Sequence, residues 1–496
     1  MQPTETRIWL KNADLLLLLL GTWCYACHSI SALTQPDQGA FAAFGYHLLQ
    51  GKTLYVDFFD HKPPAIYLLN AAFMGIGGVS ENAIGWFILF FCLLQVIIFY
   101  RLLQLLGFSR AAVLGLSICF ITVFFRYNLF GTGNFTEQYG VLCTTAALLF
   151  YLRFQQTYNY KQLLISASFW GMAFSFKEPF LLSAFPTIAM ILFGSSTKQN
   201  RLKSTGLFLA GFTIPLLLQF LWLWQSGAWS GYYHHLQHSV KYTTQGEPLW
   251  LKITQYPEYF FQWFSPEQAI TMALYLLAIP GIFLTEAPKK IIWLLLGQQC
   301  CDYMGTSLTG NGWHHYYLQS TPIMVIVIGW GISGYFRWFN GRLWTDKLGL
   351  SAITLAGLLC WQIKPWQSLA KGPEKNRYDE IERYLNKENL KRPVNLALAR
   401  EEFGFYYVQL QGLSPLRYIV PYPYHWVITK EKEKQAFLHA EYERFIKHPP
   451  EYIITGTEFA QAWIDAGMDS LTMKDYTRVS GSILPDGRDV FLLKRK

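Results

Sequence analysis

The stretch GKTLYVDFFDHKPP, residues 51–64, concentrates two acids, a histidine and two lysines between two strongly apolar segments. The chain around it is 52% hydrophobic and only 15% charged, whereas an ordinary soluble domain carries about 25% charged residues. Apolar runs close to the roughly 20 residues needed to cross a bilayer recur between Leu15 and Cys360. The sequence therefore predicts an α-helical polytopic membrane protein with residues 51–64 in a polar connection.

The composition changes near residue 364, where dense charge replaces the long apolar runs. A helical pattern covers 429–448, and strand-like patterns occur at 394–399, 417–421, 451–455 and 489–494. Strands that alternate with helices indicate a small layered sheet. We predict a transmembrane domain at 1–363 and a small C-terminal α/β domain at 364–496.

Two classes of feature are not expected in this chain. The net charge of +9 does not indicate a nucleic-acid partner, because the C-terminal region mixes both signs without a basic stripe. The eight cysteines lie in apolar runs, which argues against a disulfide framework.

The lysines and arginines predict the orientation. Arg7 and Lys11 precede the first expected span, 15–33, so the positive-inside rule places the N-terminus in the cytoplasm. Residues 65–79 reach only about 23 Å as a helix, short of a core of about 30 Å, so we expect an outer interfacial helix there. Further spans are expected at 82–101, 110–126, 136–153, 161–176, 179–194, 205–225, 268–285, 290–306, 317–336 and 348–363. This arrangement of about eleven spans gives basic inner loops and an extracytoplasmic C-terminal domain.

Asp37 stands at the start of a helical pattern that follows the first span. Residues 38–50 place Phe41, Phe44, Leu48 and Leu49 on one face, which predicts an amphipathic helix lying along the membrane interface. At its start, Asp37 fits either an N-cap or an acid held at the membrane surface for catalysis.

Lys62 precedes two prolines that fix the backbone and start the next helix. A lysine beside the free N–H groups of a helix start is suited to bind a phosphate, although a snorkelling lysine gives the same pattern. Asp57 and Asp60 either pair with Lys62 or contact a substrate. His61 is either a loop residue or a ligand.

Other polar clusters fall on the same expected outer face. They lie at 35–41, 126–138, 176–180, 232–238 and 312–319. Ionisable groups that converge at one rim of a membrane protein indicate a site. Arg126 departs from the positive-inside rule, and Glu137 fits either a helix cap or a group that orients a lysine or a sugar hydroxyl. His234 and His238 have a spacing that permits metal binding, without an evident third ligand.

Taken together, these motifs resemble a known family. GKTLYVDFFDHKPP, FKEPF at 176–180 and WHHYYLQSTP at 313–322 resemble the polyprenyl-phosphate-sugar-dependent membrane glycosyltransferases of the GT-C superfamily. The resemblance is to the protein mannosyltransferase-like and aminoarabinose-transferase-like bacterial branch. It covers the predicted membrane domain and extends loosely to residues 448–456.

This resemblance implies an inverting glycosyltransferase of the bacterial cytoplasmic membrane. It would move a sugar from a polyprenyl-phosphate donor to a hydroxyl of a glycan, lipid or protein acceptor at the outer face. Asp37 would be the general base. The donor phosphate would be bound by Lys62, Arg126, Lys177 and His315. The other expected substrate contacts are Asp57, Asp60, His61, Glu137, His314 and Tyr316. No cofactor is required, and metal use is open because some relatives carry a metal-binding glutamate where His61 stands.

Two other classes of function fit parts of the sequence. A transporter or flippase of polyprenyl-linked glycans would need a polar path through the bilayer, whereas the expected spans are nearly uncharged. An O-antigen ligase or polymerase with a polyprenyl-diphosphate donor would need an arginine-rich outer face, and Arg126 is the one obvious arginine there.

Overall fold

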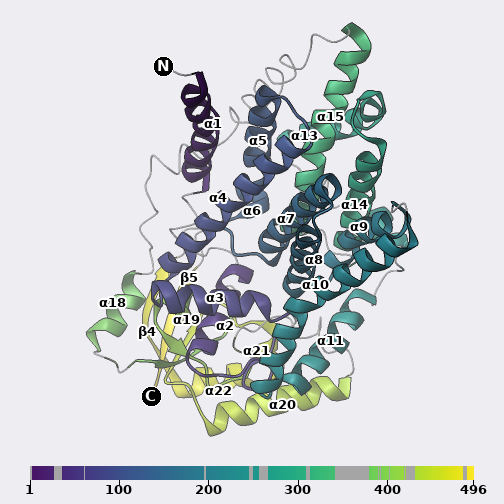
Figure 1. The fold of residues 1–496 in the computed structure, drawn as a ribbon. Coiled ribbons are helices and arrows are strands. Elements are labelled where there is room, and N and C mark those ends of the chain that lie inside the picture. The colour runs from purple at the N-terminus through teal and green to yellow at the C-terminus, as the bar shows by residue number, and fades with distance from the viewer. Residues whose placement is uncertain are drawn as a thin grey trace.

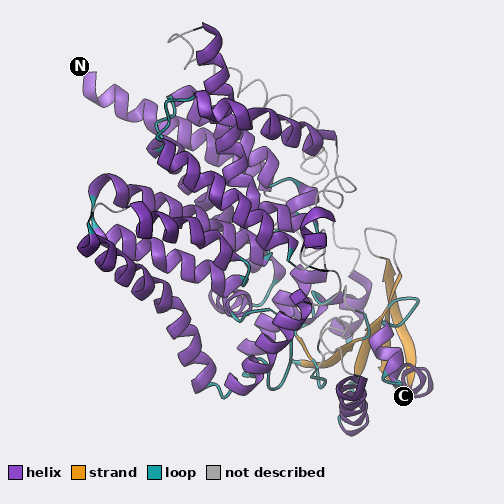
Figure 2. Ribbon diagram, turned by 90° about the vertical axis from the view of Figure 1, so that its right-hand side faces the viewer, coloured by secondary structure: helices purple, strands orange, loops and turns teal. Residues whose placement is uncertain are grey.

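In the computed structural model of the chain, a bundle of helices occupies one end and a β-sheet the other (Figures 1 and 2). The residues described are 3–26, 36–60, 62–194, 197–244, 248, 250–255, 266–308, 313–340, 379–388, 390, 392–400, 403–417, 419, 431–483 and 489–496. The expected span at 348–363 and the end of the first one lie outside them.

Most helices that correspond to predicted spans begin within two residues of them. Helices α1 and α10 begin well before, at Pro3 and Lys198 instead of residues 15 and 205, and α15 begins at Thr321 instead of residue 317. The first group is α1 Pro3–Ala26, α2 Pro36–Leu49, α3 Ala65–Gly77, α4 Glu81–Leu105, α5 Arg110–Phe124, α6 Tyr127–Phe130, α7 Thr136–Thr157 and α8 Tyr160–Phe176. The second is α9 Phe180–Gly194, α10 Lys198–Gln225, α11 Trp229–Thr244, α13 Pro266–Gly281, η2 Ile282–Leu284, α14 Lys289–Ser307, η3 His314–Ser320 and α15 Thr321–Asn340. Side-chain N-caps fix several starts: Ser80 accepts from Ala83 N–H, and Ser109 accepts from Ala112 N–H.

Among the described helices, α4 and α10 are the two that are long and apolar enough to cross a bilayer by themselves. The other apolar helices, such as α5 and α9, are shorter. Most of α10 is not covered by protein, and Leu209, Leu218 and Trp224 on it are exposed. Large exposed apolar side chains grouped on one helix are typical of a lipid-facing surface.

Helix α2 differs from its prediction. We expected an amphipathic interfacial helix, but every residue from Gln38 to His47 is buried. Phe44 stacks on Phe58 at 5.5 Å and meets Tyr67 of α3 edge-on at 5.3 Å. The opposite face packs against the C-terminal part of the chain. The amphipathic interpretation was wrong because small residues around the whole helix let neighbours approach from all sides.

The C-terminal residues form a mixed five-stranded sheet in the order β2-β1-β3-β5-β4. Its strands are β1 Val394–Leu398, β2 Gly412–Leu413, β3 Tyr452–Thr455, β4 Tyr476–Ile483 and β5 Asp489–Arg495. β1 runs parallel to β2 and β3, whereas β5 is antiparallel to β3 and β4. The helices around it are α18 Asp379–Lys387, α19 Tyr406–Gln409, α20 Glu431–Lys447, α21 Gln461–Asp465 and α22 Met468–Asp475.

Three of the expected strands and the helix at 429–448 are observed, as β1, β3, β5 and α20. The expected strand at 417–421 is not: Arg417 and Ile419 form bends, and the rest of that segment lies outside the described residues. The Arg417 carbonyl accepts its hydrogen bond from Phe59 N–H, outside the sheet. The edge strand β4 was not expected.

Candidate functional site

Charged side chains from separate parts of the bundle meet near the end that carries the sheet. Asp37 comes from the first turn of α2, and Glu137 from the first turn of α7. Lys177 lies between α8 and α9, and His315 lies in η3. With Lys62, which precedes α3, we call them the acid–lysine cluster. The structure brings the predicted polar segments around residues 37, 137, 177 and 315 close together.

Glu137 and Lys177 form a buried ion pair, with 2% and 8% of their side chains exposed. The second oxygen of the Glu137 carboxylate accepts a hydrogen bond from Thr136 Oγ1 at 2.9 Å. The Lys177 ammonium also lies 3.4 Å from the centre of the Tyr316 ring, close enough for a cation–π interaction. Each charge is therefore already engaged by a protein group.

His315 lies between the two carboxylates. Its Nε2 is 3.9 Å from Asp37 Oδ2 and 4.0 Å from Glu137 Oε1. The ring stacks on Phe135 with a centroid distance of 4.3 Å. Burial lowers the pKa of His315 to about 4, despite the two acids that favour the charged form. The imidazole is therefore neutral near pH 7.

Asp37 is the accessible acid of the cluster. Its side chain is 28% exposed, against 2% for Glu137. The 3.9 Å separation between Asp37 Oδ2 and His315 Nε2 is longer than a direct hydrogen bond. The imidazole therefore does not donate a hydrogen bond to this carboxylate oxygen. A general base must reach its substrate, and on this criterion Asp37 is favoured over Glu137.

Lys62 is half-buried and lies near the end of the polar stretch 51–64. The Tyr55 hydroxyl donates a 2.6 Å hydrogen bond to the Lys62 carbonyl, which fixes the backbone there. The positive charge of Lys62 contributes to lowering the pKa of His315, which places the ammonium near the cluster. The two acids and two lysines of the cluster have formal charges that cancel.

A polar network behind the cluster fixes the start of α2. Gln38 Oε1 accepts from Thr132 Oγ1 at 2.7 Å, and the Gln38 carbonyl accepts from Asn134 Nδ2 at 3.1 Å. Asn134 adopts a left-handed conformation with φ +66°, which asparagine tolerates better than most residues. It also exchanges hydrogen bonds with Asn70 of α3. The turn before α7 therefore holds α2 and α3 together.

The remaining acids of the polar stretch contact the protein itself. The Asp57 carboxylate accepts a 2.7 Å hydrogen bond from Thr53 N–H and is exposed. Asp60 is buried, and its carboxylate accepts a hydrogen bond from the Tyr67 hydroxyl. His61 lies outside the described residues. The roles of Asp57 and Asp60 as substrate contacts remain predictions, and both have a structural partner in the turn.

The other expected site residues lie close to η3 or within it. Arg126 is half-buried directly before α6, which packs against η3. His314 is half-buried, and burial lowers its pKa. Tyr316 is buried, as its contact with Lys177 requires.

The histidines of α11 do not add to the site as far as the structure describes them. His234 is exposed, and the side chains of His235 and His238 are outside the description. Within the described part of the chain, no three His, Cys, Asp or Glu side chains are grouped so as to hold a metal ion.

Sequence reasoning missed a buried acid next to the cluster. Asp302 of α14 accepts hydrogen bonds from Ser183 Oγ of α9 and from Gln319 Nε2 of η3, the latter at 3.1 Å. Gln319 also donates to Ser183 Oγ at 3.0 Å. These contacts connect η3, which carries His315, to α9 and α14. A single acid inside an apolar run was the signal that could have found it.

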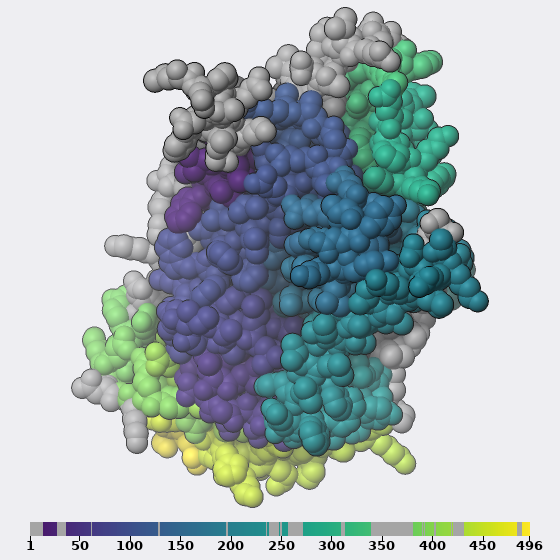
Figure 3. Space-filling model, viewed as in Figure 1, coloured from purple at the N-terminus to yellow at the C-terminus, as the bar shows by residue number. Residues whose placement is uncertain are grey.

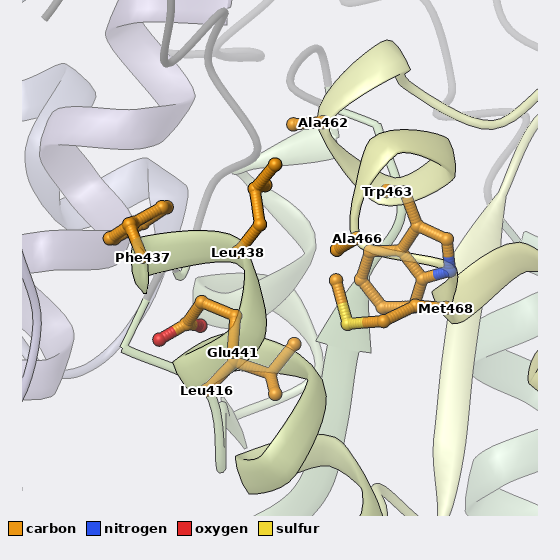
Figure 4. Close-up of a pocket in the computed structure, with 8 residues that line it drawn as sticks. All are labelled: Leu416, Phe437, Leu438, Glu441, Ala462, Trp463, Ala466 and Met468. Atoms are coloured by element: carbon orange, nitrogen blue, oxygen red, sulfur yellow. The ribbon is translucent and has the colours of Figure 1, made fainter. Parts of the chain in front are cut away.

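A small apolar cavity lies elsewhere, beside the sheet (Figure 4). It opens between α20 and the α21–α22 pair and is lined by Leu416, Phe437, Leu438, Glu441, Ala462, Trp463, Ala466 and Met468. None of its lining residues belongs to the acid–lysine cluster, so we do not place the candidate site there.

Comparison with known proteins agrees with this arrangement. Residues 61–224 match the family model described as dolichyl-phosphate-mannose-protein mannosyltransferase. The structure of ArnT from Cupriavidus metallidurans bound to undecaprenyl phosphate superposes with a TM-score of 0.64, 11% identity and coverage of 98% of both chains. The chain is therefore similar to this family over residues 61–224, and its fold is similar to that of ArnT over nearly its whole length. The resemblance stated from residues 51–64 and the two shorter motifs is thereby confirmed.

Two further matches are to solved structures. The apo structure of the same ArnT superposes with a TM-score of 0.59 and 10% identity, covering 99% of this chain and 98% of that one. The protein O-mannosyltransferase complex Pmt1–Pmt2 of S. cerevisiae, bound to its sugar donor, gives a TM-score of 0.36 and 19% identity over 48% of this chain and 34% of that one. No match is found among curated proteins. At these identities the two ArnT structures show the fold alone.

Proposed function

We propose that the chain is an inverting glycosyltransferase that moves a sugar from a polyprenyl-phosphate donor to an acceptor hydroxyl. The observation that carries the proposal is the accessible Asp37 carboxylate, 3.9 Å from a neutral His315 whose pKa is also affected by the charge of Lys62. The ArnT structure with undecaprenyl phosphate supports the donor class.

In the proposed reaction, Asp37 takes the proton of the acceptor hydroxyl. The acceptor oxygen then forms a bond to the anomeric carbon on the face opposite to the phosphate. The bond between that carbon and the phosphate oxygen breaks, and its electron pair leaves with polyprenyl phosphate. The product has inverted configuration. A positioned base contributes about 10²–10⁴ to such a rate.

The leaving phosphate gains negative charge as the bond breaks, so it needs a nearby cation. Lys62 is our choice because Lys177 is already paired with Glu137 and covered by Tyr316. A lysine at the start of α3 also adds to the N–H groups of that helix. We assign a structural role to Lys177 and Glu137, whose buried ion pair stabilises the inner side of the site.

We also propose that the reaction takes place at the outer face of the cytoplasmic membrane, with the N-terminus inside and a C-terminal domain from about residue 364 outside. The support is that residues 403–417 contact the segment that carries Asp37 and Lys62. The C-terminal part must therefore be on the same side of the membrane as the cluster.

Two experiments test the proposed function. Mass spectrometry of membrane lipids after gene loss should show a polyprenyl-phosphate sugar that accumulates. The purified protein in liposomes should then transfer the sugar of that lipid to an acceptor. Accumulation of a polyprenyl-diphosphate glycan, or of the lipid on the inner face alone, would favour a ligase or a flippase and overturn the proposal.

A further inference from the structure

Residues 403–417 contact the segment that carries Asp37 and Lys62, although most of the chain lies between them. In Figure 1, α19 of this region lies beside α2, with which it is in contact. In Figure 3, the yellow C-terminal surface borders the purple surface of the early helices. We call residues 403–417 the C-terminal brace. They lie outside the family-model match at 61–224.

The first contact is between two glycines and the backbones they face. A Cβ added at Gly39 would lie 2.7 Å from Phe405 N, and one added at Gly404 would lie 2.7 Å from Ala40 N. Real Cβ atoms do not approach backbone that closely. The brace therefore touches α2 two residues after Asp37, at a separation that only glycine allows.

The second contact is a hydrogen bond at the other end of α2. His47 Nε2 accepts from Ser414 N–H at 3.1 Å, and Nδ1 lies 2.8 Å from the Ala43 carbonyl. Because a backbone N–H can only donate, Nε2 carries no proton and Nδ1–H donates to Ala43. Tyr407 of α19 packs edge-on against the ring at 4.9 Å. The buried His47 is thus satisfied on both nitrogens.

The third contact reaches the polar stretch before Lys62. Arg417 Nη2 donates to the Tyr55 carbonyl at 2.7 Å, and the Arg417 carbonyl accepts from Phe59 N–H at 3.3 Å. Tyr55 has a left-handed backbone with φ +66°, a conformation that is unfavourable for a non-glycine residue and needs support from its surroundings. The Tyr55 hydroxyl in turn binds the Lys62 carbonyl.

We infer that the C-terminal brace positions Asp37 and Lys62 relative to one another. Gly404 and Phe405 fix the helix that carries the acid, and Arg417 fixes the turn that leads to the lysine. These are positioning residues, since they act through α2 and Tyr55 and not on the reacting atoms. The expected loss of activity rests on the proposed function. The structural part of the inference rests on the contacts alone.

The test uses the full-length protein in detergent. Gly404→Ala forces the brace away from α2, whereas Gly206→Ala, a matched control on α10, has no atom within 4 Å of the added Cβ. Hydrogen exchange should become faster in residues 36–62 of Gly404→Ala and stay unchanged in the control. The turnover number should fall roughly 10- to 100-fold, as for a displacement of about 1 Å, while the donor KM changes little.

Unchanged exchange in residues 36–62 of Gly404→Ala would overturn the inference. If Gly404→Ala does not accumulate in the membrane, variants of Arg417 test the inference instead. Arg417→Ala should speed exchange around Tyr55 and lower the turnover number, and Arg417→Lys, which can still donate to the Tyr55 carbonyl, should recover most of both. Equal behaviour of the alanine and lysine variants would contradict the brace. If the wild-type protein transfers no sugar, the proposed function fails while the exchange data still decide the brace.

Discussion

The Asp37 carboxylate lies 3.9 Å from His315 Nε2, and the imidazole is neutral because burial lowers its pKa to about 4. The acid is therefore neither hydrogen-bonded to the histidine nor paired with an imidazolium charge. The proposed role of Asp37 as a general base therefore does not rely on His315 as its hydrogen-bond partner.

The first prediction concerns this acid. Asp37→Asn keeps the shape and the N-capping ability of the side chain, since the two residues rank alike at helix starts, but it cannot take a proton. We expect normal membrane abundance and donor binding, with transfer lowered by roughly 10²-fold or more. Transfer assays at equal protein amounts measure this. Near-normal transfer would return Asp37 to the role of a helix cap.

The second prediction concerns the leaving phosphate. Lys62→Ala should weaken use of the donor more than use of the acceptor, because the ammonium is assigned to the donor phosphate. Lys62→Arg should restore it only in part, since a planar guanidinium differs from a compact ammonium. Steady-state kinetics with each substrate varied in turn give the answer. A donor KM and rate that do not change would remove Lys62 from the site.

The third prediction concerns the buried ion pair. Glu137→Gln leaves the Lys177 ammonium without its counter-charge, and loss of one partner of a buried pair typically costs about 3–5 kcal/mol. We expect a clear drop in thermal stability in detergent. Addition of Lys177→Met should recover much of the loss, because both charges are then absent. A double variant less stable than Glu137→Gln would show that the two charges do not act as a pair.

The fourth prediction concerns pH. Burial lowers the pKa of His47 to about 4, below the value of about 6.5 of an unfolded histidine. Between these values the unfolded chain binds more protons than the folded one, so stability falls as the pH is lowered from about 6.5 to 4. His47→Gln can still accept from Ser414 but does not titrate, so the fall should be shallower. Thermal midpoints measured across this range test it, and an equally steep profile in the variant would exclude His47.

The sequence predicted the parts of the fold that depend on local patterns. Helix positions and the strands β1, β3 and β5 follow from apolar runs and alternation, and Asp37, Lys177 and His315 stood out as polar residues at helix ends. The burial of α2 could not be predicted, because it depends on Gly404 and Tyr407, far along the chain. Asp302 was missed because its role depends on Ser183 and Gln319, which a linear pattern does not bring together.

The hydrogen bond between His47 and Ser414 joins residues 367 positions apart, and this distance has a consequence for biosynthesis. Ribosomes add about 5–20 residues per second, so Ser414 is made roughly 20–70 s after His47. During that interval the helix that carries Asp37 is present without the residues that cover it. Helix α2 and the acid–lysine cluster are therefore covered only when synthesis has reached the last fifth of the chain, and a chain truncated before Gly404 would lack the C-terminal brace.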